Sequence, residues 1–85
     1  MAIKLMPKAL DDLEFWKKSG NKAILKKISE LVENICETPF QGIGKPEPLK
    51  YDLSGSWSRR ITVEHRLVYE IINDVLEIQS LKGHF

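Results

Sequence analysis

The most distinctive chemistry of this sequence is a cluster of basic side chains in a segment that favours β-strands. Arg59, Arg60, His65 and Arg66 lie within eight positions, among Trp, Ile, Val, Leu and Tyr residues. The three arginines of the chain all belong to this cluster, whereas its lysines are spread over both halves. A planar guanidinium binds phosphate and carboxylate groups through paired hydrogen bonds, which an ammonium group does not do. The cluster therefore predicts an anion site on a sheet.

Strand alternation decides which of these arginines can share a face. Successive side chains of a strand point to opposite sides, so at most one of Arg59 and Arg60 lies on a solvent-facing side. Arg66 alternates with Leu67 and Tyr69, which have the character of core residues, and is therefore expected on the open face. For Arg66 taken alone, a structural salt bridge and an anion site are equally good interpretations.

Two further residues have types suited to proton transfer. Glu47 lies between Pro46 and Pro48, which hold its backbone extended. A solvated loop glutamate is the default interpretation, and a rigidly presented general base is the alternative. His84 is the penultimate residue, where chain ends usually fray, but it follows a strand-like segment that ties it to the sheet. His65 falls in a turn and is interpreted as structural.

Length and composition limit the classes of protein that are possible. The 85 residues predict one domain, and the net charge of +1 gives no general attraction to nucleic acid. No apolar run reaches about 18 residues, so no membrane span is expected. Cys36 is the single cysteine, and no Cys/His spacing indicates a zinc site. The absence of a possible internal disulfide favours a cytoplasmic location.

Hydrophobic periodicity predicts an α+β fold in which two helices pack on one face of a small, mainly antiparallel twisted sheet, leaving the other face free. Asn73-Asp74 is expected to form a two-residue hairpin turn. The expected ranges are 2–6 for an edge strand, 8–18 and 21–37 for the helices, 39–50 for a stiff loop, and 56–62, 66–73 and 75–82 for three further strands.

The apolar positions of these elements predict one core. In the first helix, Leu10, Leu13 and Trp16 recur every three residues, and the second helix has a longer apolar stripe. The residues expected to meet between the helices and the sheet are Ile24, Ile28, Leu31, Ile35, Leu67, Tyr69 and Ile71.

The segments GKPEPLK, LSGSWSRRI and EHRLVYEI, followed by a penultimate histidine, resemble the YoeB/Txe family of toxins within the RelE-like superfamily. The resemblance covers the chain from the first helix to the C-terminus and is most specific over residues 44–69. It implies a RelE-like single domain over residues 1–85. It also implies a toxin of a type II toxin–antitoxin pair that cleaves translated messenger RNA on the ribosome without a metal or cofactor. A YefM-like antitoxin and a homodimer are the partners it implies.

The same resemblance assigns roles to residues. Glu47 matches the family's general base, Arg66 the residue that stabilises the phosphate, and His84 the general acid. The positions expected to hold RNA are Lys50, Arg59, Arg60 and Phe85, the last by stacking on a base.

This chain ends in Gly83-His84-Phe85, where the family ends in Tyr-His-Tyr. Gly83 is therefore expected to loosen the backbone before His84 and to give the last residues little anchorage. The alternative function is a non-catalytic basic module that clasps an acidic partner peptide or RNA.

Overall fold

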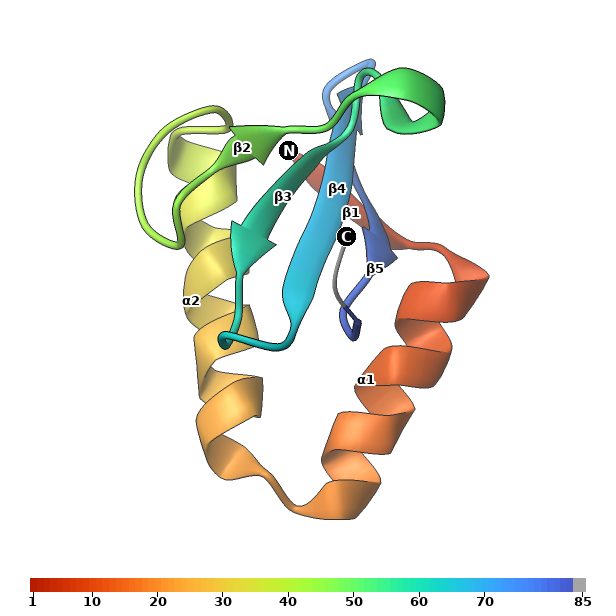
Figure 1. The fold of residues 1–85 in the computed structure, drawn as a ribbon, viewed down its shortest axis with the longest axis vertical. Helices are drawn as coiled ribbons and strands as arrows, with labels where there is room; N and C mark the ends of the chain where they lie inside the picture. The colour runs from red at the N-terminus through yellow and green to blue at the C-terminus, as the bar shows by residue number, and fades with distance from the viewer. Residues whose placement is uncertain (84–85) are drawn as a thin grey trace.

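The computed structural model describes residues 1–83 as two helices against a five-stranded sheet, as Figure 1 shows. The strands lie in the order β1-β5-β4-β3-β2, and β1 runs parallel to β5 while the other neighbouring pairs are antiparallel. Along the chain the elements are β1 (Ala2–Leu5), α1 (Pro7–Ser19), α2 (Lys22–Glu37), β2 (Glu47–Pro48), η1 (Tyr51–Leu53), β3 (Trp57–Arg60), β4 (Arg66–Ile72) and β5 (Val75–Ser80). The predicted fold class is confirmed.

The ends of the helices follow from local chemistry. Pro7 occupies the first turn of α1, where its missing N–H costs nothing, and Gly20 ends the helix in the left-handed region at φ 70°. The side chain of Asn21 caps α2 by accepting a hydrogen bond of 3.1 Å from the Ile24 N–H. Thr38, which precedes Pro39, leaves the helical region as expected.

The hairpin turn between β4 and β5 is also confirmed. Asn73 and Asp74 both have positive φ, of 50° and 62°, which suits the twist of an antiparallel ribbon. The short edge strand β2, by contrast, was not predicted, because two residues between prolines carry no alternation that a pattern could detect.

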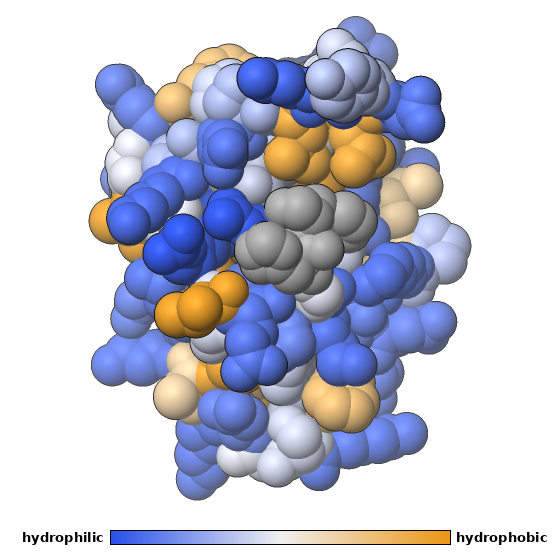
Figure 2. All heavy atoms as spheres, in the orientation of Figure 1, coloured by the Kyte–Doolittle hydropathy of each residue, from blue (hydrophilic) through white to orange (hydrophobic). Residues whose placement is uncertain are grey.

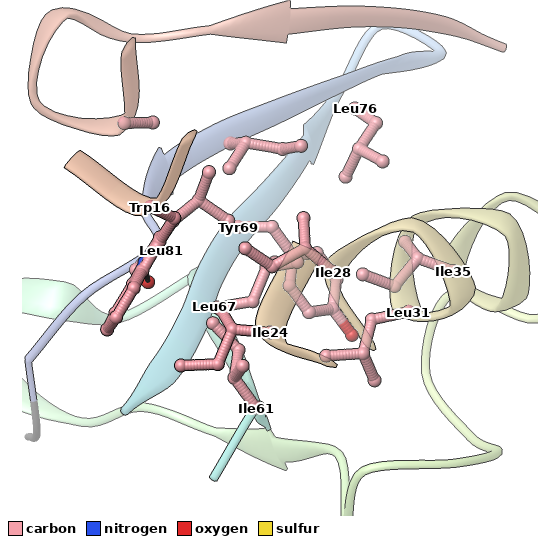
Figure 3. Close-up of a cluster of buried hydrophobic side chains, with 12 residues drawn as sticks. Trp16, Ile24, Ile28, Leu31, Ile35, Ile61, Leu67, Tyr69, Leu76 and Leu81 are labelled. Atoms are coloured by element: carbon pink, nitrogen blue, oxygen red, sulfur yellow. Dashed lines mark hydrogen bonds between the residues drawn. The ribbon is translucent and has the colours of Figure 1, made fainter. Parts of the chain in front are cut away.

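The core lies between the helices and the sheet, and Figure 3 shows side chains of α2 directed toward Leu67 and Tyr69 of β4. Six of the seven predicted core residues are buried, and Ile71 packs against them partly buried. The helix predicted from the spacing of Leu10, Leu13 and Trp16 is confirmed, although Leu10 itself is 51% exposed. The buried residues of α1 are Ala9, Asp12 and Trp16.

Leu31 provides the test of this core. Its side chain is fully buried, so Leu31→Ala should lower the free energy of unfolding by about 2–5 kcal/mol through lost burial and the cavity that remains. Leu10→Ala is the matched control on an exposed leucine and should cost far less. Urea denaturation of the two variants and the wild type measures the difference, and equal destabilisation would contradict this arrangement of the core.

Candidate functional site

Glu47 and Arg66, separated by a loop and a strand in sequence, meet on the sheet face that the helices leave open. Glu47 pairs with Ser58 across β2 and β3, and Arg66 pairs with Arg60 across β3 and β4. Ser58 and Arg60 are two residues apart on β3 and therefore point to the same face. The Arg66 Nη1 atom lies 3.6 Å from the Glu47 Oε2 atom. The side chain of Arg66 is 11% exposed and that of Glu47 is 63% exposed. The carboxylate is therefore open to a ligand while the guanidinium is fixed below it.

The guanidinium of Arg66 is incompletely satisfied by the described residues. Its Nη1 donates to Ser58 Oγ at 3.3 Å, but its buried Nε has no hydrogen-bond partner within residues 1–83. The Nε atom of Arg60, directly opposite on β3, is also buried without a partner among residues 1–83. An unpaired buried donor costs free energy, so two such donors side by side favour binding of an anion.

This face is less free than expected. Ser58 and Val68, which pair across β3 and β4 and point to the same side as Arg66, are buried. The Arg66 guanidinium, which is hydrogen-bonded to Ser58 Oγ, covers part of Ser58 and so contributes to its burial. Figure 2 shows the molecule in the orientation of Figure 1, with strongly hydrophilic side chains over the side of the face where β3 runs.

Apart from Arg59, the remaining predicted site residues divide into three groups. Arg60 pairs with Arg66 and therefore lies on the same open face of the sheet as Glu47 and Arg66, which we call the Glu47–Arg66 face. Lys50 is exposed immediately before η1. His84 and Phe85 lie outside the described residues.

Arg59 has a different position from the one predicted. Its side chain is fully buried on the helix-facing side of the sheet, where its N–H groups donate to protein oxygens. The acceptors are Tyr69 Oη at 3.2 Å, Asn34 Oδ1, and the carbonyl oxygens of Ile43 at 3.1 Å, Thr38 at 2.6 Å and Gln41 at 2.9 Å. A guanidinium enclosed in this way is not available to an RNA phosphate. The expectation that Arg59 holds RNA is therefore not supported by the structure.

The network around Arg59 instead positions the loop that leads to Glu47. Tyr69 Oη donates to the Pro39 carbonyl at 2.6 Å, and Asn34 Oδ1 accepts from the Ile43 N–H at 3.1 Å. Sequence reasoning missed Asn34 and treated Tyr69 only as apolar core. A signal was available, because Arg59 alternates with core residues and a buried arginine requires several acceptors.

A second network holds the end of β5. The buried Asp12 carboxylate accepts hydrogen bonds from the Leu81 N–H at 2.9 Å and from Lys8 Nζ at 2.7 Å. Trp16 Nε1 donates to the Leu81 carbonyl at 2.9 Å. Gly83 was expected to loosen the backbone and to give the last residues little anchorage; the first expectation is wrong at Gly83 itself, and the second concerns residues outside the described range. The N–H of Gly83 donates to His65 Nδ1 at 3.1 Å, and its carbonyl accepts from the Arg66 N–H at 2.9 Å.

Two other kinds of site are not found in the described part of the chain. Among residues 1–83, no helix combines the length and the apolar character needed to cross a bilayer. Within the same residues, no three or more His, Cys, Asp or Glu side chains are grouped so that they could hold a metal ion.

Comparison with known proteins identifies the family. The model of the YoeB-like toxins of bacterial type II toxin–antitoxin systems matches residues 5–85. The chain belongs to this family. It is 53% identical to Toxin YoeB of Escherichia coli strain K12 over 75 residues, which cover 88% of each chain. It is 45% identical to Toxin YoeB of Streptomyces coelicolor over 85 residues, which cover all of both chains.

Solved structures of YoeB proteins have the same fold. A YoeB/ParE toxin from Agrobacterium tumefaciens is 42% identical, with full coverage of both chains and a TM-score of 0.96. A chain of a YoeB–YefM complex from Staphylococcus aureus is 42% identical, with 100% of this chain and 98% of that chain covered and a TM-score of 0.90. A YoeB dimer from the same organism has a TM-score of 0.91 at 41% identity, with the same coverage.

The Tyr69 hydroxyl gives a test of the loop network. Tyr69→Phe leaves Arg59 Nε and the Pro39 carbonyl without their partner, and an unsatisfied buried polar group costs about 1–3 kcal/mol. Tyr51→Phe is the control, because Tyr51 is 91% exposed. Urea denaturation at neutral pH should show a loss for the first variant and little change for the second.

The same residue predicts a dependence on alkaline pH. Burial raises the pKa of Tyr69, and its hydrogen bond to Arg59 and the charge of Arg59 oppose this in part. The folded state therefore holds the phenolic proton more tightly than the unfolded state. That stability is complete below the unfolded pKa of about 10 and is lost as pH rises through the folded pKa. The stability difference between wild type and Tyr69→Phe should narrow above about pH 10, and a constant difference would contradict this role.

Proposed function

We propose that this chain is the toxin of a type II toxin–antitoxin pair and acts as a ribosome-dependent, metal-independent endoribonuclease on translated messenger RNA. The observation that carries the proposal is a contact in a chain of the YoeB-like family between an exposed carboxylate, Glu47, and a buried guanidinium, Arg66. The Nε atom of that guanidinium has no hydrogen-bond partner among the described residues. A base beside a phosphate-binding group is what cleavage of RNA by its own 2′-hydroxyl requires.

The chemical step divides between three residues. Glu47 accepts the proton of the 2′-hydroxyl, and the 2′-oxygen forms a bond to the adjacent phosphorus. Negative charge develops on the non-bridging oxygens, where Arg66 donates hydrogen bonds. His84 gives a proton to the 5′-oxygen as the bond from phosphorus to that oxygen breaks. The products are a 2′,3′-cyclic phosphate and a 5′-hydroxyl, so no electrons are transferred and no water is consumed.

Neighbouring groups bind the RNA chain rather than react. Arg60, paired with Arg66 across the strands, has a buried Nε that lacks a partner among the described residues and suits a backbone phosphate. Lys50 follows the strand that carries Glu47 and is exposed. Phe85 stacks on a base of the message, since an aromatic ring does this without sequence-specific hydrogen bonds.

Dependence on the ribosome follows from the small binding surface. The catalytic carboxylate is exposed and not enclosed, so the protein alone gives the message little orientation. A ribosome that fixes the message supplies the proximity which otherwise must come from binding energy. This substrate places the protein in the cytoplasm.

The partner that inhibits the enzyme is a YefM-like antitoxin. Two of the solved relatives, both from Staphylococcus aureus, are a YoeB–YefM complex and a YoeB dimer. By analogy, an acidic and apolar segment of the antitoxin folds over the Glu47–Arg66 face, and two copies of this chain form a homodimer. A segment that folds on binding can cover such a face completely.

The competing function is a basic module that binds an acidic peptide or RNA without turnover. Both functions use the same arginines, so binding measurements do not separate them. Release of fragments with 2′,3′-cyclic phosphate ends does, because a binding module leaves the RNA intact.

Leaving-group substitution tests the assigned roles. The substrate is a ribosome-bound message whose cleavage site carries either the normal 5′-oxygen or a 5′-sulfur, which leaves without a proton. His84→Gln should cleave the oxygen substrate about 10²–10⁴-fold more slowly than the wild type. The rate of this variant should be largely restored on the sulfur substrate. Glu47→Gln should stay slow on both substrates. Arg66→Lys keeps the charge but loses the paired hydrogen bonds, and should cost about 10²–10³-fold on the oxygen substrate.

Glu33→Gln, on the exposed side of α2, is the control and should cleave at the wild-type rate. Equal defects of His84→Gln on both substrates would remove its role as the acid. Intact RNA with wild-type protein on a translating ribosome would reject the proposed activity as a whole.

Antitoxin binding gives a separate prediction. Arg66→Gln should bind a YefM-like antitoxin more weakly than the wild type. The reason is that truncating one member of a charge pair buried between toxin and antitoxin costs about 2–5 kcal/mol of binding free energy. Isothermal titration calorimetry measures the difference. Lys26→Gln, an exposed lysine of α2, should bind with wild-type affinity. Equal affinities of the two variants would show that the antitoxin covers another face.

A further inference from the structure

Two consecutive residues, His65 and Arg66, hold the backbone of Gly83 at both of its polar groups. The Gly83 N–H donates to His65 Nδ1 at 3.1 Å, and the Gly83 carbonyl accepts from the Arg66 N–H at 2.9 Å. The contact joins residues far apart in sequence, at the start of β4 and beyond the end of β5. Gly83 is therefore fixed relative to Arg66, whose guanidinium is the proposed phosphate ligand.

The imidazole of His65 is itself held in a defined direction. Its backbone N–H donates to Thr62 Oγ1 at 3.0 Å, and its carbonyl accepts from the Ile61 and Thr62 N–H groups at 2.9 and 3.1 Å. The ring packs edge-on against Trp16, with centroids 4.9 Å apart. Trp16 is tied in turn to the Leu81 carbonyl, so α1 supports both the ring and the segment it binds.

The hydrogen bond to Gly83 requires a particular form of His65. A backbone N–H can donate to Nδ1 only when that nitrogen carries no proton, so the imidazole is neutral with its proton on Nε2. His65 is an acceptor here, and Gly83 is the group it positions. Because Gly83 directly precedes His84 in the chain, this constraint is relevant to catalysis.

Gly83 has particular need of such a tether. Its φ of 104° lies in a region that residues with a Cβ rarely adopt, and glycine moves in and out of such conformations at little cost. Without an acceptor on His65, the Gly83 N–H loses its partner and the peptide can rotate. The direction in which the backbone leaves Gly83 is then no longer fixed.

We propose that His65 is a positioning residue for the general acid: by binding the Gly83 N–H, it fixes where the chain enters His84 relative to the Arg66 guanidinium. This inference rests on the proposed function, in which His84 protonates the leaving oxygen. Displacement of a catalytic group by about 1 Å can cost about 10²-fold in rate. Loss of this hydrogen bond should therefore slow proton donation while leaving the protein folded.

Two substitutions separate the acceptor from the ring. His65→Phe keeps an aromatic ring against Trp16 but has no acceptor. His65→Asn loses the ring but places an amide oxygen near the former position of Nδ1. Glu64→Gln changes an exposed neighbour in the same turn and serves as the control.

The first measurement is independent of RNA cleavage. Amide hydrogen exchange by NMR should show faster exchange of the Gly83 N–H in His65→Phe than in wild type, and slow exchange again in His65→Asn. Histidine ¹⁵N shifts of the wild-type protein should show Nδ1 without a proton. Unchanged Gly83 exchange in His65→Phe would overturn the inference, whether or not the protein cleaves RNA.

The second measurement uses the ribosome-bound message with a 5′-oxygen or a 5′-sulfur leaving group. His65→Phe should cleave the oxygen substrate about 10- to 100-fold more slowly than wild type and the sulfur substrate at nearly the wild-type rate. His65→Asn should recover most of the loss on oxygen, and Glu64→Gln should show none. Equal defects of His65→Phe on both substrates, or equal defects of the Phe and Asn variants, would reduce His65 to a purely structural residue. If wild type leaves the RNA intact while the exchange results hold, the proposed function fails and the tether remains.

Discussion

The buried guanidinium of Arg59 is the interaction on which the arrangement of the site depends. It joins the end of α2, the loop that follows and strand β4 through hydrogen bonds to side-chain and carbonyl oxygens. A buried charge without acceptors would be very costly, so the loop must keep its carbonyls directed at Arg59. Gly42 makes this close approach possible, because a Cβ there would collide with Asn34 Oδ1. The loop then delivers Glu47 to the edge of the sheet in one register.

Two tethers therefore hold the segments that reach Arg66 from the middle and from the end of the sequence. Arg59 and Tyr69 fix the loop before Glu47, while Asp12, Trp16 and His65 fix the segment after β5. Both are built from side chains on the helix side or in turns, so the open face keeps the groups proposed to act on RNA. A small domain has a limited hydrophobic core, so polar contacts of this kind add order at its site.

Much of the fold could be predicted from the pattern of apolar residues. The two helices and the three C-terminal strands follow from periods of 3.6 and 2, and Asn73-Asp74 marked its hairpin. Strand β2 and the exposed position of Leu10 could not be predicted in this way. A two-residue strand exists only through its pairing with β3, and the residues of α1 that are buried depend on segments distant in sequence, such as Leu81, whose N–H binds the Asp12 carboxylate.

The sequence by itself determined the family, the α+β architecture and the candidate groups Glu47 and Arg66, because spaced motifs and hydrophobic periodicity are local properties of a chain. Only the tertiary structure decided that these two groups lie 3.6 Å apart and that Arg59 belongs to the interior. It alone revealed that His65 binds Gly83. Strand register and the partners of a buried polar group depend on segments distant in sequence, so alternation could divide Arg59 from Arg60 between faces without showing what each would meet.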